Sequence, residues 1–215
     1  MGKIDKILKI LDDLYPWDGR CFLHHETPWQ LLFATILSAQ CTDDRVNMVT
    51  AELYIKYPSL TAFAEADLND LEKAIHSTGF FRAKARHLQE SARKLLHEFN
   101  GQVPSSMEKL TSLGGVGRKT ANVVRGHIFG IPSITVDTHV KRVSHRLGLT
   151  SHTDPTKIEF ELMGILPESH WIRYNQQVIT HGRQTCLARS PCCEKCKLNV
   201  CCAMYEKQNE NKEEV

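Results

Sequence analysis

Apolar residues recur every three or four positions along most of this chain of 215 residues. In the first segment Ile4, Ile7, Leu8 and Leu11 follow this spacing with charged residues between them, the pattern of an amphipathic helix. The same period predicts helices over residues 3–14, 28–38, 43–56, 68–77, 82–99, 106–112, 117–129, 138–147, 155–165 and 171–182. Strand-like character is confined to residues 134–136, too short for a sheet, so the pattern predicts an all-α fold.

Capping residues mark several of the expected helix ends. Asp67 can cap a helix start, and Asp154 followed by Pro155 is a cap with proline at the first helical position. Asn100 and Gly101 are expected to end the long helix before them. The polar tail from residue 206 onward is expected to be frayed.

The segment from Leu113 to Ala121, LGGVGRKTA, places three glycines ahead of a lysine that opens a helix. Just upstream, Ser105 and Glu108 form a capping-box pattern, so the unit is predicted to be a helix, a glycine-rich hairpin and a second helix. Gly115 and Gly117 can adopt positive φ and lie close to another chain. The amides at the start of the second helix form a site for an anion such as a phosphate.

Two other glycine motifs are excluded at this hairpin. A P-loop needs glycine directly before the lysine, where Arg118 stands, and a dinucleotide fingerprint needs a third glycine where Thr120 stands. The block from Arg82 to Arg125 holds nine Lys and Arg against three Glu, a net charge of +6, although the whole chain carries +2. A basic block around a phosphate-binding hairpin indicates a nucleic-acid partner. For part of the block, a solvated helix face is the competing interpretation.

Six of the eight cysteines fall within residues 186–202. A cytosolic helical protein has little use for disulfides at this density, so metal ligation, by zinc or by an iron–sulfur cluster, is the leading interpretation. Zinc sites usually have two CxxC pairs, whereas Cys193 and Cys196 form the single pair here. Spacing alone leaves the register of four ligands open, because Cys192 and Cys201 each directly precede another cysteine.

Asp137 lies eighteen residues beyond Lys119, at the expected N-cap of the next helix. Taken alone, an aspartate at this place is best explained as a cap. Paired with the hairpin lysine, it could instead stabilise positive charge that develops during a reaction.

The hairpin, the Val-Asp-Thr-His segment around Asp137 and the cysteine loop, in this order, resemble the endonuclease III family of helix-hairpin-helix DNA glycosylases. The resemblance extends to LSAQCTD at residues 37–43 and HGR at residues 181–183, and so covers nearly the whole chain. The family's [4Fe-4S] loop has the spacing C-x6-C-x2-C-x5-C. In this chain that spacing falls on Cys186, Cys193, Cys196 and Cys202.

The resemblance implies a bifunctional DNA glycosylase and AP lyase that removes oxidised pyrimidines from duplex DNA. Lys119 would attack C1′ of the damaged nucleotide, and β-elimination would then cleave the strand 3′ to the abasic site. Asp137 would stabilise the oxocarbenium character of the transition state. The hairpin residues Gly115, Val116 and Gly117 would bind the DNA backbone.

The family extrudes the damaged nucleotide, and the resemblance implies which residues fill the gap. Gln40 would enter the vacated space, and Phe80, after Gly79, would wedge beside the opposing strand, where the family more often has leucine. A core aromatic is the alternative for Phe80, and His139 would either contact the DNA backbone or make a structural hydrogen bond. Gly114 stands where the family usually has proline, a change expected to loosen the hairpin.

Three other functions compete with this one. The adenine-specific branch of the superfamily places a catalytic glutamate in the helix before the glutamine-bearing turn, but residues 28–39 contain no carboxylate. A DNA-binding module without catalysis would not need both Lys119 and Asp137. An electron-transfer iron–sulfur protein would leave the hairpin and the basic block unexplained.

The resemblance also implies two helical domains with DNA bound in the cleft between them. One is a bundle over residues 22–131 with the hairpin; the other joins residues 1–21 to 132–215 and carries the cluster. Lys119 and Asp137 would face each other at the cleft. With no signal peptide or membrane span in the sequence, we expect a cytoplasmic, nucleoid-associated monomer without a membrane partner. Its partner would be double-stranded DNA containing damaged pyrimidines or abasic sites.

Overall fold

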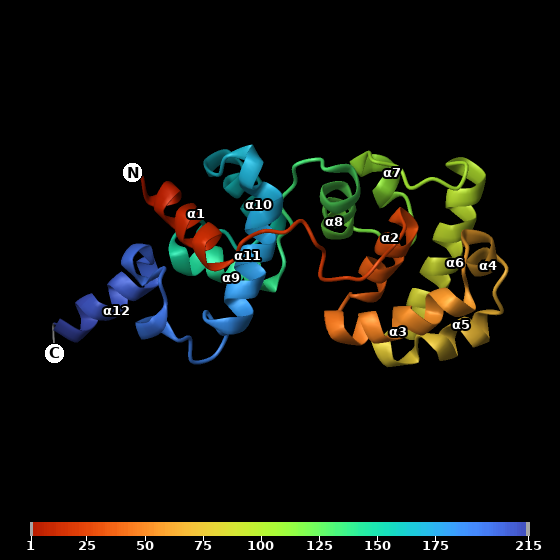
Figure 1. The fold of residues 1–215 in the computed structure, drawn as a ribbon, viewed down its shortest axis with the longest axis horizontal. Coiled ribbons are helices and arrows are strands. Elements are labelled where there is room, and N and C mark those ends of the chain that lie inside the picture. The colour runs from red at the N-terminus through yellow and green to blue at the C-terminus, as the bar shows by residue number, and fades with distance from the viewer. Residues whose placement is uncertain (1, 214–215) are drawn as a thin grey trace. The chain divides into compact units, whose positions relative to one another are not determined.

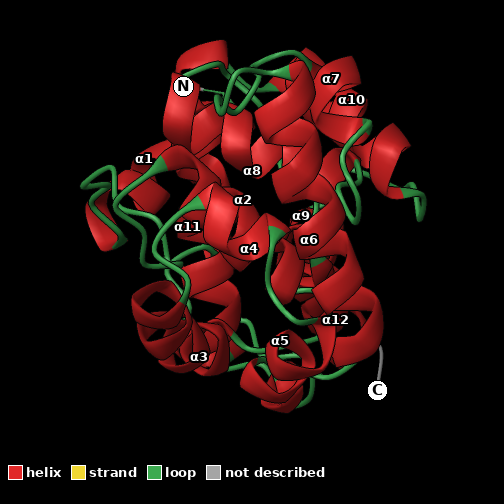
Figure 2. Cartoon of the chain, turned by 90° about the vertical axis from the view of Figure 1, so that its right-hand side faces the viewer, coloured by secondary structure: helices red, strands yellow, loops and turns green. Residues whose placement is uncertain are grey.

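The computed structural model describes residues 2–213, and Figure 2 draws this part of the chain as helices and loops alone. The chain divides into two compact units, residues 21–131 and residues 1–20 with 132–215. The division expected from the sequence places its first boundary one residue later, and Met1 and residues 214–215 lie outside the described residues. Within the described range, no helix is both long and apolar enough to cross a bilayer.

The continuous unit is organised around α2, whose residues from Leu31 to Leu37 are all buried. α2 packs against α3, α6 and α8, and an aromatic cluster closes one end of this core, with the rings of Phe33 and Phe63 4.9 Å apart. The elements of this unit, coloured orange to green in Figure 1, are α2 (Pro28–Leu37), α3 (Asp43–Lys56), α4 (Leu60–Ala64), α5 (Leu68–Ala74), a 3-10 turn η1 (His76–Thr78), α6 (Phe81–Glu98), α7 (Met107–Thr111) and α8 (Arg118–Phe129).

The discontinuous unit is built around α11, which packs against α9 and α1. Tyr174 of α11 is fully buried, and its hydroxyl lies 2.8 Å from Ser144 Oγ of α9, so the polar end of this core ring is satisfied. The helices are α1 (Lys3–Leu14), α9 (Thr138–Leu147), α10 (Pro155–Ile165), α11 (Trp171–Gln184) and α12 (Ala203–Glu213), with 3-10 turns η2 (Glu168–His170), η3 (Cys193–Lys195) and η4 (Asn199–Cys201).

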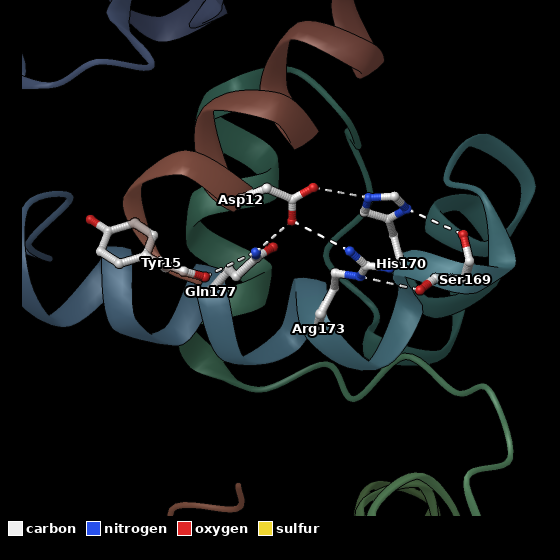
Figure 3. A network of polar contacts seen from close by, with 6 residues as sticks. All are labelled: Asp12, Tyr15, Ser169, His170, Arg173 and Gln177. Atoms are coloured by element: carbon white, nitrogen blue, oxygen red, sulfur yellow. Dashed lines mark hydrogen bonds and ion pairs between the residues drawn. The ribbon is translucent and has the colours of Figure 1, made fainter. Parts of the chain in front are cut away.

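A polar network ties the end of α1 to the start of α11, as Figure 3 shows. Gln177 Nε2 donates to Asp12 Oδ1 at 2.8 Å and to the carbonyl of Tyr15 at 3.1 Å. The other Asp12 oxygen lies 3.3 Å from His170 Nε2, and Arg173 approaches the carboxylate at 3.8 Å. The network fixes Tyr15, which follows α1, against the middle of α11.

Helix bounds agree with the sequence pattern where a cap is unambiguous. Asp67 and Asp154 accept hydrogen bonds from the amides of Asp70 and Lys157, as their positions predict. The prediction for α7 is wrong by one residue, because Ser106 rather than Ser105 accepts from the N3 amide. α4, five residues long, has too few turns to show a period, and α12 continues to Glu213 through the tail that was expected to fray.

Candidate functional site

The glycine-rich hairpin links α7 to α8 through a tight turn in which the Val116 amide donates to the Leu113 carbonyl at 3.2 Å. Gly115 has φ +72°, as the sequence predicts. The same prediction for Gly117 is wrong, since this residue is the N-cap of α8 with φ −91° and ψ 178°, an extended conformation open to any residue. The turn therefore requires glycine at position 115 for its backbone conformation. At position 117, glycine matters because the absence of a side chain leaves open space in front of α8.

The hairpin rests on one face of α6. Ser91 Oγ donates to the Gly114 carbonyl at 3.1 Å, and Lys94 Nζ donates to the Ser112 carbonyl at 3.1 Å. A Cβ on Gly114 would lie 3.2 Å from the backbone of His87, and one on Gly115 would lie 2.7 Å from the ring of His87. Where the sequence led us to expect a loosened hairpin, Gly114 allows close packing of this loop on α6.

Lys119 lies in the first turn of α8 and is exposed, while Val116 is buried beneath the turn. The first amide of α8 to bond back into the helix is that of Ala121, which donates to the Gly117 carbonyl at 3.0 Å. The opening amides of an α-helix carry the positive end of the helix dipole and favour an anion. A Cβ on Gly117 would meet no protein atom within 4 Å, so a ligand backbone can approach these amides closely.

Asp137 caps α9 as its position predicts, because its Oδ1 accepts from the Val140 amide at 2.7 Å. The cap holds the half-buried carboxylate in one orientation, and one oxygen is committed to the helix start. His139 packs over Gly182 of α11, and its Nδ1 lies 3.2 Å from a guanidinium nitrogen of Arg142. These contacts give His139 a structural role within its unit. Asp137 and Lys119 belong to different units.

Gln40 and Phe80 share an unusual backbone conformation. Their φ angles are +53° and +48°, in the left-handed region that non-glycine residues rarely occupy. Both residues are exposed, and Phe80 exposes 66% of its surface, so the core-aromatic alternative for Phe80 is wrong. Strain of this kind, about 1–3 kcal/mol for each residue, is typical of functional loops.

The four cysteines expected as ligands line one cavity at the end of α9 and α11. Its remaining walls combine apolar side chains, among them Val143 and Leu198, with Arg146 and His181. Cys201 is 5% exposed and packs into the core instead, and its Sγ contacts the Leu198 carbonyl. Cys192 reaches the cavity rim and is exposed. The four cysteines are Cys186, Cys193, Cys196 and Cys202.

These thiols are close enough to affect one another. Burial raises the pKa of Cys196 most, and the neighbouring thiols of Cys186 and Cys202 raise it further against the lowering effect of the Leu198 amide. A bound cationic centre reverses this balance, since thiols that ligate a metal lose their protons. Among the described residues, no three His, Cys, Asp or Glu side chains converge on a point that would hold a single metal ion.

Two residues to which the sequence assigned no role hold the cysteine loop, although His181 belongs to the HGR segment that carries the resemblance. Arg146 of α9 donates to Cys186 Sγ at 3.3 Å and to the Leu187 carbonyl at 2.7 Å. His181 of α11 places Nε2 3.6 Å from Cys196 Sγ, and its Nδ1 lies 3.0 Å from the Tyr15 hydroxyl. Burial lowers the pKa of His181 to about 4, so the ring is neutral. The HGR segment pointed to His181, whereas Arg146 belongs to no motif that the sequence offered.

Comparison with known proteins matches residues 33–168 to the family of HhH-GPD superfamily base excision DNA repair proteins. An endonuclease III of Synechocystis sp. is 54% identical over 198 residues, which are 92% of this chain and 90% of that protein. The endonuclease III of Bacillus subtilis is 39% identical over 97% of this chain and 95% of its own length.

Two solved structures resemble the fold over almost its full length. One is a trapped endonuclease III–DNA covalent intermediate, with a TM-score of 0.90, 42% identity, and coverage of 97% of this chain and 99% of that one. The other is a non-covalent endonuclease III–DNA complex, with a TM-score of 0.91, 41% identity, and coverage of 98% and 99%.

Proposed function

We propose that this chain, which belongs to the endonuclease III family of base excision DNA repair proteins, uses Lys119 as the nucleophile of its reaction. It is a DNA glycosylase with AP lyase activity. The observation that carries the assignment is the position of Lys119, exposed in the first turn of α8 two residues after an open glycine N-cap. A backbone bound at the hairpin amides would lie within reach of this amine.

The chemistry follows from an amine as nucleophile. The neutral Lys119 nitrogen attacks C1′ as the bond to the damaged base breaks, and the carboxylate of Asp137 stabilises the positive charge that develops on the sugar. The resulting iminium acidifies the C2′ proton, so its removal expels the 3′ phosphate by β-elimination. Water then hydrolyses the iminium and frees Lys119. Asp137 suits its role because the cap to Val140 fixes its orientation before DNA arrives.

DNA binding is assigned to the hairpin and to two loops. The amides around Gly115, Val116 and Gly117 hold a backbone phosphate, supported by the positive end of α8. Gln40 fills the space left by the extruded nucleotide, and Phe80 wedges beside the opposing strand. We assign oxidised pyrimidines and abasic sites in duplex DNA as substrates, bound by one copy of the chain. His139, which Arg142 contacts, supports the pocket in this assignment.

Cys186, Cys193, Cys196 and Cys202 are proposed to hold a [4Fe-4S] cluster. Thiolates are the ligands such clusters take, and four of them line one cavity. The cysteines contain one CxxC pair, Cys193 and Cys196, whereas zinc sites usually have two, so an iron–sulfur cluster suits the set better. Bound there, the cluster would cross-link residues 186–202 to one another, and Arg146 would hold this segment against the end of α9.

The nucleophile can be tested by borohydride trapping, which reduces the iminium and links the enzyme to lesion-bearing DNA. Lys119→Gln should still bind abasic duplex but form no trapped complex, whereas Lys109→Gln, an exposed lysine of α7 close by in sequence, should trap normally. Asp137→Asn should slow base release more than cleavage at a preformed abasic site. Undiminished trapping by Lys119→Gln would refute the assignment, as would loss of DNA binding in the same variant.

A further inference from the structure

The strained residues Gln40 and Phe80 come from separate loops of the continuous unit. Gln40 lies in the turn after α2, where the Cys41 amide donates to the Ser38 carbonyl at 3.1 Å. Phe80 follows η1 and is the N-cap of α6. Because Gln40 and Phe80 lie in different loops, a contact that holds both loops would keep these two exposed, strained residues in register.

Lys84 of α6 connects the two loops. Its side chain is 4% exposed, and Nζ donates to the Leu37 carbonyl at 2.8 Å and to the Thr78 carbonyl at 2.8 Å. Leu37 is the last residue of α2, three positions before Gln40, and Thr78 ends η1, two positions before Phe80. The backbone amide of Lys84 also donates to the Phe80 carbonyl at 3.1 Å. One residue therefore fixes the start of both loops and the strained residue of the second.

Burying the Lys84 ammonium away from water costs free energy that its hydrogen bonds must offset. Burial lowers the pKa of Lys84, and the nearby Cys41 thiol opposes that shift. The two carbonyls that receive Nζ end helical segments, where backbone oxygens lack helical partners and the dipole favours a cation. A neutral apolar residue would fill this space with less desolvation but would leave both carbonyls unpaired.

We propose that Lys84 is a positioning residue that sets Gln40 and Phe80 at the separation needed to replace an extruded nucleotide and to wedge the opposing strand. This inference rests on the proposed roles of those two residues in the duplex. Lys84 itself touches neither DNA nor the reacting atoms. Its substitution should therefore impair reactions that require a nucleotide to be extruded from a duplex, and spare chemistry on a site that is already unpaired.

The test compares one variant on two substrates. Lys84→Met should slow single-turnover cleavage at an abasic site in duplex DNA by roughly 10- to 100-fold, the loss expected from a displacement of about 1 Å. Cleavage at an abasic site in single-stranded DNA should change less than about twofold. The control is Arg93→Met, which also removes a bond from α6 to a backbone carbonyl, at Ala64, and touches neither loop. It should leave both rates unchanged.

Further variants separate this proposal from the assignments on which it rests. Gln40→Ala and Phe80→Ala should each slow the duplex reaction. Adding Lys84→Met to a variant that carries both alanine substitutions should slow that reaction little further. If the two alanine variants act at the wild-type rate, the duplex roles themselves are wrong. If they are slow and Lys84→Met is not, or if Lys84→Met slows both substrates equally, Lys84 is not a positioning residue. Lys84→Gln, which keeps a shorter donor, supplies the same comparison if the methionine variant does not fold.

Discussion

Replacing Gly115 and Gly117 of the hairpin one at a time should separate protein stability from DNA binding. Gly115→Ala puts an L residue at φ +72° and places its Cβ 2.7 Å from the His87 ring. Gly117→Thr adds a β-branched side chain at φ −91° into space with no protein atom within 4 Å. Threonine is also an accepted N-cap residue, so this change suits the start of α8.

The magnitudes follow from those two geometries. The left-handed conformation costs an alanine roughly 1–2 kcal/mol, and an off-rotamer His87 ring adds about 0.5–1.5 kcal/mol. A loss of about 1.5–3.5 kcal/mol lowers the melting temperature by roughly 3–14 °C in a chain of this size. Gly117→Thr should change stability by less than about 0.5 kcal/mol. Losing one charge-assisted amide–phosphate bond, about 1.5–3 kcal/mol, should weaken duplex affinity roughly 10- to 100-fold.

Melting curves followed by circular dichroism measure the first effect, and fluorescence anisotropy with a duplex that carries an abasic-site analogue measures the second. Titrations at several salt concentrations show whether a phosphate contact is lost, since each contributes about −0.9 to the log–log slope for duplex DNA. If Gly117→Thr binds as tightly as wild type, the hairpin amides are not the phosphate site. If Gly115→Ala melts at the wild-type temperature, the strain argument is wrong.

Two further predictions concern the cysteines and a histidine. Cys196→Ser should lower iron content and solubility, whereas Cys192→Ser, at an exposed thiol, should leave both nearly unchanged; equal losses would show that the ligand register is wrong. Burial, and then His25, lowers the pKa of His127, so the unfolded state binds more protons in acid and stability is lost as the pH falls below about 6.5. His127→Gln should flatten this loss in urea unfolding between about pH 7 and about pH 5, and His97→Gln, at an exposed position, should not.

The parts of the fold that sequence predicts well are those decided by local chemistry. The bounds of α1, α3, α9 and α10 coincide with the predicted ranges, because a cap or a proline stands at most of these starts. Asp137 was expected as an N-cap from its position and is one. Ser105 and Ser106 are chemically equivalent, however, and only the packing of α7 decides which hydroxyl reaches the N3 amide.

The candidate site shows the same division. Lys119, Asp137 and the four cysteines can be found from sequence because each lies in a short motif with a characteristic spacing. Lys84 has no such signal, since its two acceptors lie 47 and 6 residues away and meet only in the folded unit. Gly115 and Gly117 look alike in sequence, but only Gly115 has a positive φ angle. The residue type, which is the same at both positions, cannot distinguish them.

The discontinuous unit has a consequence for how the chain is made. α1 is synthesised before residues 21–131, but its apolar residues Ile7, Leu8 and Leu11 pack into a core completed only by α9 and α11. At about 5–20 residues per second, a ribosome needs about 10–30 s to pass from α1 to the end of α11. A twelve-residue helix is marginal alone in water, so α1 stays unfolded, with its apolar side chains exposed, until α9 and α11 have been made. The unit that contains Lys119 is contiguous in sequence and can fold during this time.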